Sequence, residues 1–229
     1  MTTTLLHVSD PHLDGSAARA ARLRAVLDLL PPSRTPDAIV ITGDIADTGS
    51  AGEYAQFNGL VSGRAPWLAV PGNHDDPAQL RGSVLDVGDL RVVGLDTTVP
   101  GEDHGVLRED VVEQAIEQAQ GARRVVLALH QPPVAIGHAY ADPTGLRNPD
   151  ALARLIERIG TVTAVLCGHV HTPTVSSFAG VPVIVAPGVV SALRLDPDHR
   201  PLTNREHAPG LALHRFDDGA VTTTFHYAS

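Results

Sequence analysis

Short apolar runs recur along the chain, and most of them end in polar residues. The runs lie at residues 5–10, 38–44, 67–75, 91–98, 125–133 and 162–171. Their length and their content of β-branched residues predict strands buried on both faces. Helical patterns separate the runs, at residues 16–30, 51–62, 107–120 and 149–159. This alternation of strand and helix predicts an α/β layered domain.

The last third of the chain has a different pattern. Strands are predicted at residues 181–188, 210–216 and 220–227, with no helix between them, and "FDDGAV" resembles a hairpin turn. We therefore expect antiparallel β-structure here, which could form a second sheet. Two polar segments, 134–148 and 189–209, are predicted as long loops, which are often functional in compact domains. Without any linker-like tract, residues 1–229 are expected to form a single domain.

Composition and charge narrow the classes of protein. Hydrophobic residues make up 43% of the chain and aromatic residues 3%, so aliphatic side chains must fill the core. The net charge of −9 argues against a partner that is a nucleic-acid polymer or an anionic membrane. It permits a small phosphate substrate, because bound cations can reverse the local charge.

Localisation is predicted from what the sequence contains. Cys167 is the single cysteine, so no intrachain disulfide can form. The first residues lack a signal-peptide pattern, and no apolar run approaches the length of about 20 residues that spans a bilayer. We expect a cytoplasmic protein without a membrane span; a homodimer is left open.

The polar ends of the predicted strands carry a set of metal-ligating side chains. Carboxyl ends of strands are where open α/β sheets bind ligands. Each residue taken alone is well explained as a turn or cap. Together and in this order they point to a site, and His169 and His171 lie on one side of an extended segment. The set consists of Asp10, His12, Asp44, Asn73, His130, His169 and His171, with His74 beside Asn73.

Seven donors are more than one metal ion needs when water must also bind. Two ions that share a bridging carboxylate fit the count. Oxygen and imidazole ligands, without thiolate, suit Mn, Fe or Zn better than Ca or Mg. Two such ions, roughly 3.5–4 Å apart, can hold a hydroxide between them and clamp an in-line displacement at phosphorus.

The series D-x-H, GD, GNHD, H and GHVH, between residues 10 and 171, resembles the calcineurin-like metallophosphoesterases. The resemblance implies a four-layer α-β-β-α sandwich, in which two mixed sheets are flanked by helices. It also implies two metal sites with Asp44 bridging them. One site would consist of Asp10, His12, Asp44 and His171, and the other of Asp44, Asn73, His130 and His169.

The resemblance also assigns catalytic roles. His74 would contact the substrate phosphate together with Asn73 and would protonate the leaving oxygen, as a general acid. Asp47 matches the acid that orients this histidine in related phosphoprotein phosphatases, although a loop or helix-cap carboxylate explains it equally well. Asp75 and Asp76 are expected to cap a short helix after Pro77 or to support the ligands from outside.

Two departures from the family pattern bear on the substrate. Thr48 stands where phosphoprotein phosphatases have a phosphate-binding arginine, and Gln131 stands where many small bacterial members have a second histidine. The motif style is most similar to class III cyclic nucleotide phosphodiesterases, which implies hydrolysis of cyclic nucleotides of the 3′,5′-cyclic AMP type. The alternatives are another nucleotide or a phosphomonoester as substrate, or a non-catalytic scaffold of the same fold.

The sequence also leads to expectations for several single residues and for one loop. Cys167 and Trp67 are expected in the core, and Gly72 and Gly168 are expected to let the backbone turn beside the metals. The loop at 135–148 could line a base pocket, as could Arg194 or Arg200, although surface salt bridges are the simpler explanation for the arginines. His138 and His207 lie in loops that could reach the cleft, and no role is assigned to either.

Overall fold

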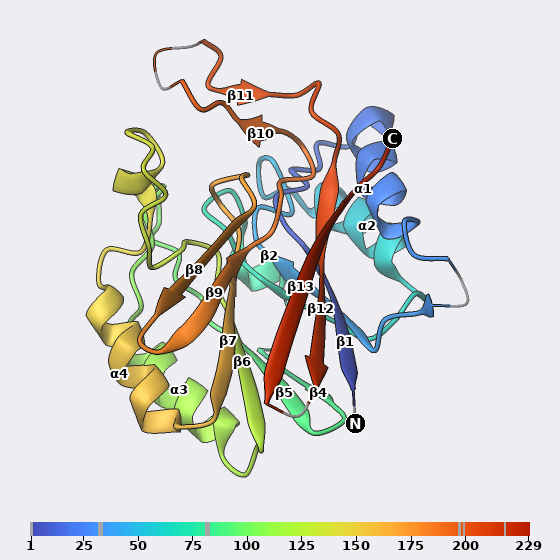
Figure 1. Cartoon of the computed structure of the whole chain (residues 1–229). Coiled ribbons are helices and arrows are strands. Elements are labelled where there is room, and N and C mark those ends of the chain that lie inside the picture. Colours follow the sequence, from blue (N-terminus) through green and yellow to red (C-terminus); the bar gives the residue numbers. More distant parts are fainter. Residues whose placement is uncertain (1, 32–33, 81–82, 197, 199, 218) are drawn as a thin grey trace.

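The computed structural model describes residues 2–31, 34–80, 83–196, 198, 200–217 and 219–229 (Figure 1). The α-helices are α1 (Ala17–Leu27), α2 (Ala51–Val61), α3 (Glu109–Ala119) and α4 (Pro149–Ile159), and two short 3₁₀ helices are η2 (Pro77–Gln79) and η3 (Asp142–Thr144). The strands are β1 (Thr3–Val8), β2 (Ala38–Thr42), β3 (Trp67–Val70), β4 (Val84–Val87), β5 (Leu90–Gly94), β6 (Arg124–Ala128), β7 (Val162–Cys167), β8 (Thr174–Phe178), β9 (Val181–Val185), β10 (Ala192–Leu193), β11 (Thr203–Asn204), β12 (Gly210–Asp217) and β13 (Ala220–Tyr227). No described helix combines the length and the apolar character needed to cross a membrane.

The strands form two mixed sheets and a small ribbon. One sheet has the order β13-β12-β1-β2-β3, in which β1, β2 and β3 are parallel and β12 and β13 are antiparallel. The other has the order β4-β5-β6-β7-β9-β8, with parallel strands inside and an antiparallel strand at each edge. Strands β10 and β11 form the ribbon at the top of Figure 1.

Side-chain alternation along β1 shows how the layers are built. Leu6 belongs to a buried cluster with Leu23 of α1, on the helix side of the first sheet. The neighbouring Leu5 points the opposite way and joins Val126 of β6 in a cluster between the two sheets. Helices α3 and α4 cover the outer face of the second sheet, where Leu155 packs in a further cluster. The predicted four-layer α-β-β-α sandwich is thereby confirmed.

The C-terminal strands are arranged differently from the expectation. They do not form a sheet of their own, because β9 pairs in parallel with β7 in the six-stranded sheet, whereas β12 pairs with β1 in the other. Strands β12 and β13 are joined as the predicted hairpin, with Asp217 opposite Ala220; Asp218 of the predicted turn lies outside the described residues.

Four of the described strands, β4, β8, β10 and β11, were not predicted from the pattern. Strands β4 and β8 lie at edges of the second sheet and are only partly buried, so their sequences "VLDV" and "TVSSF" lack a continuous apolar run. The loop at 134–148 contains η3, and the loop at 189–209 contains the ribbon β10–β11. Cys167 is fully buried, as expected for a core residue. Trp67 is partly buried and packs against the core, with its ring edge-on to Phe57 and the ring centroids 5.4 Å apart.

Candidate metal centre

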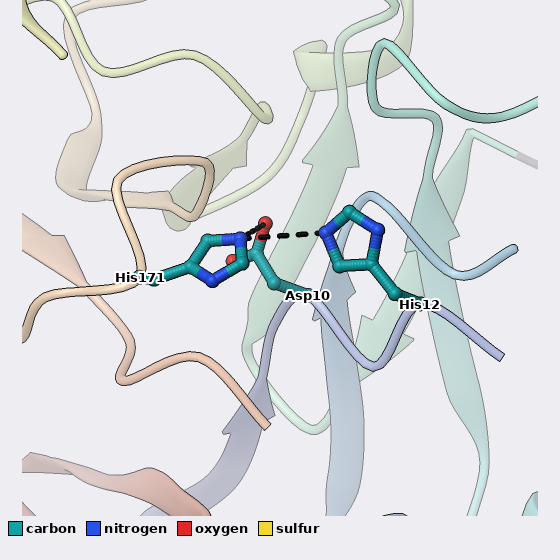
Figure 2. Close-up of side chains that lie close together, drawn as sticks. All are labelled: Asp10, His12 and His171. Atoms are coloured by element: carbon teal, nitrogen blue, oxygen red, sulfur yellow. Dashed lines mark hydrogen bonds and ion pairs between the residues drawn. The ribbon is translucent and has the colours of Figure 1, made fainter. Parts of the chain in front are cut away.

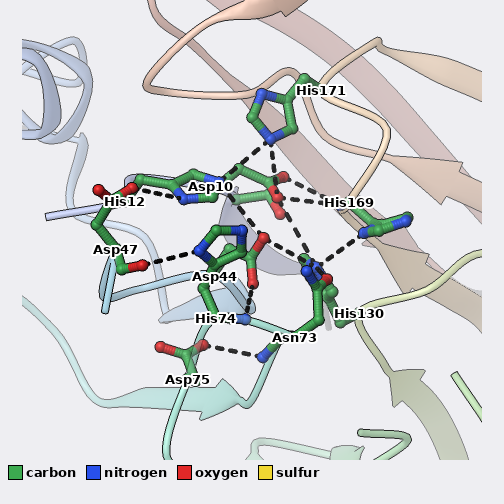
Figure 3. Close-up of polar contacts among 12 residues, drawn as sticks. Asp10, His12, Asp44, Asp47, Asn73, His74, Asp75, His130, His169 and His171 are labelled. Atoms are coloured by element: carbon green, nitrogen blue, oxygen red, sulfur yellow. Dashed lines mark hydrogen bonds and ion pairs between the residues drawn. The ribbon is translucent and has the colours of Figure 1, made fainter. Parts of the chain in front are cut away.

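The predicted site residues follow five strands that end at one edge of the sandwich. Strands β1, β2 and β3 of the first sheet and β6 and β7 of the second each end two to four residues before a member of the set. The short loops beyond them bring all eight side chains together (Figure 3). The members of the set are Asp10, His12, Asp44, Asn73, His74, His130, His169 and His171. The centre is therefore built by both sheets.

Unusual backbone conformations aim these side chains inward. Five of the eight residues have positive φ: Asp10 (55°), His12 (43°), Asp44 (48°), His169 (71°) and His171 (51°). Among the other described residues that are not glycine, Ala179 alone shares this feature. Such conformations cost energy for a residue with a side chain, and they persist where the surroundings enforce them, typically at functional sites.

Two glycines let the loops approach the acidic residues closely. A Cβ atom at Gly72 would lie 2.2 Å from an Asp44 carboxylate oxygen, and one at Gly168 would lie 1.8 Å from the Ser9 hydroxyl oxygen. Neither glycine has positive φ. The requirement for glycine at these two positions is therefore close approach rather than the sharp turn that the sequence suggested.

Asp10, His12 and His171 form the first group of donors (Figure 2). The Nε2 atoms of the two histidines lie 3.3 Å apart, and His171 Nε2 lies 3.4 Å from Asp10 Oδ1. All three ligand atoms lie within 4.8 Å of one another. Asp44 closes this group, since its Oδ2 lies 3.4 Å from His12 Nε2.

Asp44, His130 and His169 form the second group, also within 4.8 Å of one another. The central atom is His130 Nε2, which lies 3.4 Å from Asp44 Oδ2, 3.2 Å from His169 Nδ1 and 3.2 Å from the amide oxygen of Asn73. Asp44 Oδ2 thus contacts both groups, which is the position required of a bridging carboxylate.

The second nitrogen of each of these four histidines has a polar partner outside the centre. His130 Nδ1 donates to the Thr42 carbonyl oxygen at 2.6 Å, and His12 Nδ1 lies 3.3 Å from an Asp47 carboxylate oxygen. His171 Nδ1 lies 2.9 Å from the Ser191 hydroxyl, and His169 Nε2 lies 2.7 Å from the Thr144 hydroxyl. A neutral imidazole that donates outward turns a lone pair inward.

This arrangement fits metal ions. Four inward lone pairs and two buried carboxylates would repel one another without a positive charge between them. Ligands about 2.1 Å from one tetrahedral ion lie about 3.4 Å apart, close to the 3.2–3.4 Å separations found within each group. The donor set, rich in imidazole and carboxylate, suits Mn, Fe or Zn.

The pKa shifts of the residues in the centre also indicate that this place favours a positive charge. Burial opposes ionisation of Asp10, yet the attraction of His171 lowers its pKa to about 2, and His130 lowers the pKa of Asp44 in the same way. Burial also opposes protonation of His130, but Asp44 raises the pKa of this imidazole to about 9. His12 and His169 behave oppositely: burial lowers their pKa values to about 4 and about 3. The carboxylates thus favour a cation at this place.

His74 differs from the ligand candidates in its exposure. The imidazole is exposed, and its Nδ1 donates to the backbone carbonyl oxygen of Asp47 at 2.8 Å, while its backbone N–H donates to Asp44 at 2.9 Å. A ligand atom of His74 also lies within 4.8 Å of those of His12 and Asp44, so proximity alone does not separate His74 from the ligands. The Asp47 carboxylate contacts His12 and, at 2.6 Å, Arg19, rather than His74.

Asp75 and Asp76 take the two supporting positions that were expected. The Asp75 carboxylate accepts from the backbone N–H groups of Ile45, Ala46 and Gly72, and so ties together the loops that carry Asp44 and Asn73. Asp76 caps η2 by accepting from the Ala78 N–H at 3.1 Å.

The two departures from the family pattern have their own contacts. Gln131 is fully buried and bridges Thr97 to the Asp103 carbonyl oxygen. The Thr48 hydroxyl donates to Glu53 in the first turn of α2. No sequence pattern marks Thr144, Ser191 and Arg19, because their contacts with the ligand loops are made only in the folded chain.

A cavity of about 470 Å³ opens beside the centre. Its lining includes His74, Arg205 and five of the metal-ligand candidates, namely His12, Asp44, Asn73, His169 and His171. Arg194, Arg200, His138 and His207 are not among its described lining residues, although Arg200 packs over the ring of Tyr140 at 4.8 Å. Its apolar and aromatic lining residues are Tyr140, Ala141, Val170, Val190, Leu193 and Leu202.

Comparisons with known proteins agree with this picture. The family model described as calcineurin-like phosphoesterase matches residues 3–173. A cAMP/cGMP dual specificity phosphodiesterase of Mycobacterium tuberculosis is 38% identical over 211 residues, which cover 80% of this chain and 66% of that relative. The 3′,5′-cyclic adenosine monophosphate phosphodiesterase CpdA of Pseudomonas aeruginosa is 34% identical over 203 residues, which cover 82% of this chain and 73% of the relative.

The fold has a counterpart among solved structures. A dimetal phosphatase from Danio rerio aligns with a TM-score of 0.72 at 13% identity, covering 99% of this chain and 96% of that one. Identity this low supports the fold alone, whereas the family match over residues 3–173 includes the motifs between residues 10 and 171. The chain belongs to the calcineurin-like phosphoesterase family, as a metal-dependent phosphodiester hydrolase.

Proposed function

We propose that this chain hydrolyses cyclic nucleotides of the 3′,5′-cyclic AMP type at a dinuclear metal centre. The observation that carries the proposal is the set of inward lone pairs in two groups, joined by Asp44 Oδ2 and open to the cavity. The names of the two bacterial relatives support the choice of substrate. Both sheets contribute residues to this one centre, which further supports the proposal that residues 1–229 form a single domain.

The chain's own residues define the two proposed metal sites. Asp10, His12, Asp44 and His171 would hold one ion, and Asp44, Asn73, His130 and His169 would hold the other. When bound, the ions supply charge stabilisation at phosphorus and activate water as the nucleophile. Asp44 is the bridging ligand in this assignment, because the same carboxylate oxygen contacts a histidine of each group at 3.4 Å.

His74 is proposed as the general acid. Its Nδ1–H is held by the Asp47 carbonyl oxygen, which fixes the ring and leaves Nε2 as the nitrogen that can carry a proton to the substrate. Opening a cyclic phosphate breaks a P–O bond and leaves an alkoxide, which is a poor leaving group until it is protonated. Nε2–H of the imidazolium would give its proton to that oxygen, and Asn73 beside it would contact the phosphate.

The cavity wall supports a nucleoside as the remaining part of the substrate. Its apolar residues, together with Tyr140, offer a surface on which a planar base can lie, while Arg205 adds a cation to the lining. A phosphate without an apolar substituent would leave this wall unused. The net charge of −9 continues to argue against a nucleic-acid polymer as partner.

The test is a substrate panel with Mn²⁺: 3′,5′-cyclic AMP, 2′,3′-cyclic AMP, bis-p-nitrophenyl phosphate and p-nitrophenyl phosphate. We expect the highest kcat/KM for 3′,5′-cyclic AMP and little cleavage of the monoester. Strong monoester cleavage without turnover of either cyclic nucleotide would favour a broad-specificity phosphatase. No turnover of any substrate by the metal-loaded protein would favour a non-catalytic scaffold.

A further inference from the structure

His169 is held between the metal centre and the loop at 134–148. Its Nδ1 faces His130 Nε2 at 3.2 Å, inside the second group of donors. Its Nε2 faces the hydroxyl oxygen of Thr144 at 2.7 Å. Thr144 is the last residue of η3 and lies 25 positions before His169 in the chain, so this contact exists only in the folded protein.

The direction of the hydrogen bond between Thr144 and His169 follows from the partners of the hydroxyl. Thr144 Oγ1 also lies 2.9 Å from the Ala141 carbonyl oxygen, which can only accept. A hydroxyl has one hydrogen, and here it donates to that carbonyl. The same oxygen must then accept from His169 Nε2–H. The neutral imidazole consequently carries its proton on Nε2 and its lone pair on Nδ1, which is the atom that faces the second metal site.

The surrounding loop holds Thr144 in place. The Asp142 carboxylate accepts from the backbone N–H of Ile136 at 2.8 Å and from that of Gly137 at 3.1 Å. The backbone N–H of Leu146 donates to the Pro132 carbonyl oxygen at 3.0 Å. A β-branched side chain on such a braced turn has little rotational freedom. The hydroxyl therefore offers a fixed acceptor to His169.

We propose that Thr144 is a positioning residue that fixes the tautomer and the ring orientation of His169 and thereby sets metal affinity at the second site. The inference rests on the proposed dinuclear centre and goes beyond it, since no motif of the sequence includes Thr144. Partners of this kind, which hold a metal-ligating histidine from outside, typically contribute 10–100-fold to metal affinity.

Calorimetric titration of the metal-free protein with Mn²⁺ tests the proposal without relying on activity. For Thr144→Val, which keeps the shape and removes the hydroxyl, we expect about 10–100-fold weaker binding at one of two sites. Thr144→Ser, which keeps the hydroxyl, should restore the affinity to within about threefold of the parent, and circular dichroism should show all variants folded.

A double-mutant cycle assigns the effect to His169. In a His169→Ala background, Thr144→Val should cause no further loss of Mn²⁺ affinity; in a His171→Ala background, it should still weaken the remaining site about 10–100-fold. Parental affinity of Thr144→Val at both sites, or an equal loss in both backgrounds, would overturn the proposal. If the parent protein itself bound no Mn²⁺, the proposed function would fail, which is a distinguishable outcome.

Discussion

The backbone carbonyl oxygen of Asp47, and not its carboxylate, accepts the hydrogen bond from Nδ1 of His74, at 2.8 Å. The carboxylate instead lies 3.3 Å from His12 Nδ1. One residue thus contacts the proposed general acid through its main chain and a proposed metal ligand through its side chain. The resemblance to phosphatases had suggested a contact from the Asp47 side chain to His74.

This division leads to a prediction for Asp47→Asn. The variant keeps the carbonyl that holds His74 but weakens the contact with His12, so Mn²⁺ affinity should fall about tenfold. At saturating Mn²⁺, kcat for 3′,5′-cyclic AMP should stay within about tenfold of the parent value. Calorimetry and steady-state kinetics on the same preparation measure both quantities. If kcat fell as much as in His74→Ala while metal affinity stayed unchanged, the Asp47 carboxylate would be the group that orients His74.

For His74→Ala we expect two ions to remain bound while kcat falls about 10²–10⁴-fold, as is typical for loss of a general acid. Metal analysis after gel filtration, together with turnover of 3′,5′-cyclic AMP, measures the two effects. The neighbouring Asn73→Ala is the matched comparison, because it removes an amide oxygen 3.2 Å from His130 Nε2 and should weaken metal binding. Loss of an ion from His74→Ala would instead make His74 a ligand, which its proximity to His12 and Asp44 allows.

Asp44→Asn should lose at least one of the two ions. The substitution is nearly isosteric and removes the charge of the carboxylate that contacts both groups of donors. Metal content by mass spectrometry is the measurement, and Asp110→Asn is the control, since that side chain is 76% exposed. Two tightly bound ions in Asp44→Asn would show that the bridge is not needed.

Gly72→Ala should displace the carboxylate of Asp44, which lies directly against Gly72. The added Cβ would lie 2.2 Å from Asp44 Oδ1, so either the carboxylate or the loop must move, and we expect at least tenfold weaker Mn²⁺ binding, as for loss of a supporting partner. Gly59→Ala in α2 meets nothing within 4 Å and should stabilise the fold by about 1 kcal/mol. Equal metal affinity of the two variants would contradict the close-approach explanation.

The buried pair His7 and His214 predicts a pH dependence of stability. The two imidazoles share a contact of 3.0 Å between the sheets, and burial lowers the pKa of His214 to about 3 and that of His7 well below its usual value. The unfolded chain, with a histidine pKa of about 6.5, binds more protons than the folded chain between these values. Stability is therefore fully present above about pH 6.5 and falls as the pH decreases.

The measurement is the free energy of unfolding at pH 7.5 and 5.5. Between these pH values His214 should contribute a loss of about 1.4 kcal/mol. The loss should be smaller by that amount in His214→Gln, whose side chain does not titrate. Equal losses in the two proteins would mean that His214 is already protonated in the folded state.

The sequence by itself determined the four α-helices, nine of the described strands and the members of the candidate metal centre. The apolar runs had to be strands because they are short, β-branched and interrupted by helical periods. Within each sheet the polar ends gather because the parallel strands end at one edge. The packing of the two sheets brings these two edges together. The carboxylates and histidines named from the motifs are those that the fold brings together. Their roles remain predictions that the variants above test.

Tertiary structure decided what local pattern cannot encode. The pairing of β9 with β7 and of β12 with β1 depends on long-range register, and the edge strands β4 and β8 lack a buried face that would mark them. The contact between Thr144 and His169 depends on how the folded chain positions their two loops. So does the hydrogen bond from His74, which goes to the carbonyl oxygen of Asp47 and not to its carboxylate. Motifs specify which atoms can bind a metal; packing specifies which nitrogen of each imidazole is left free to do so.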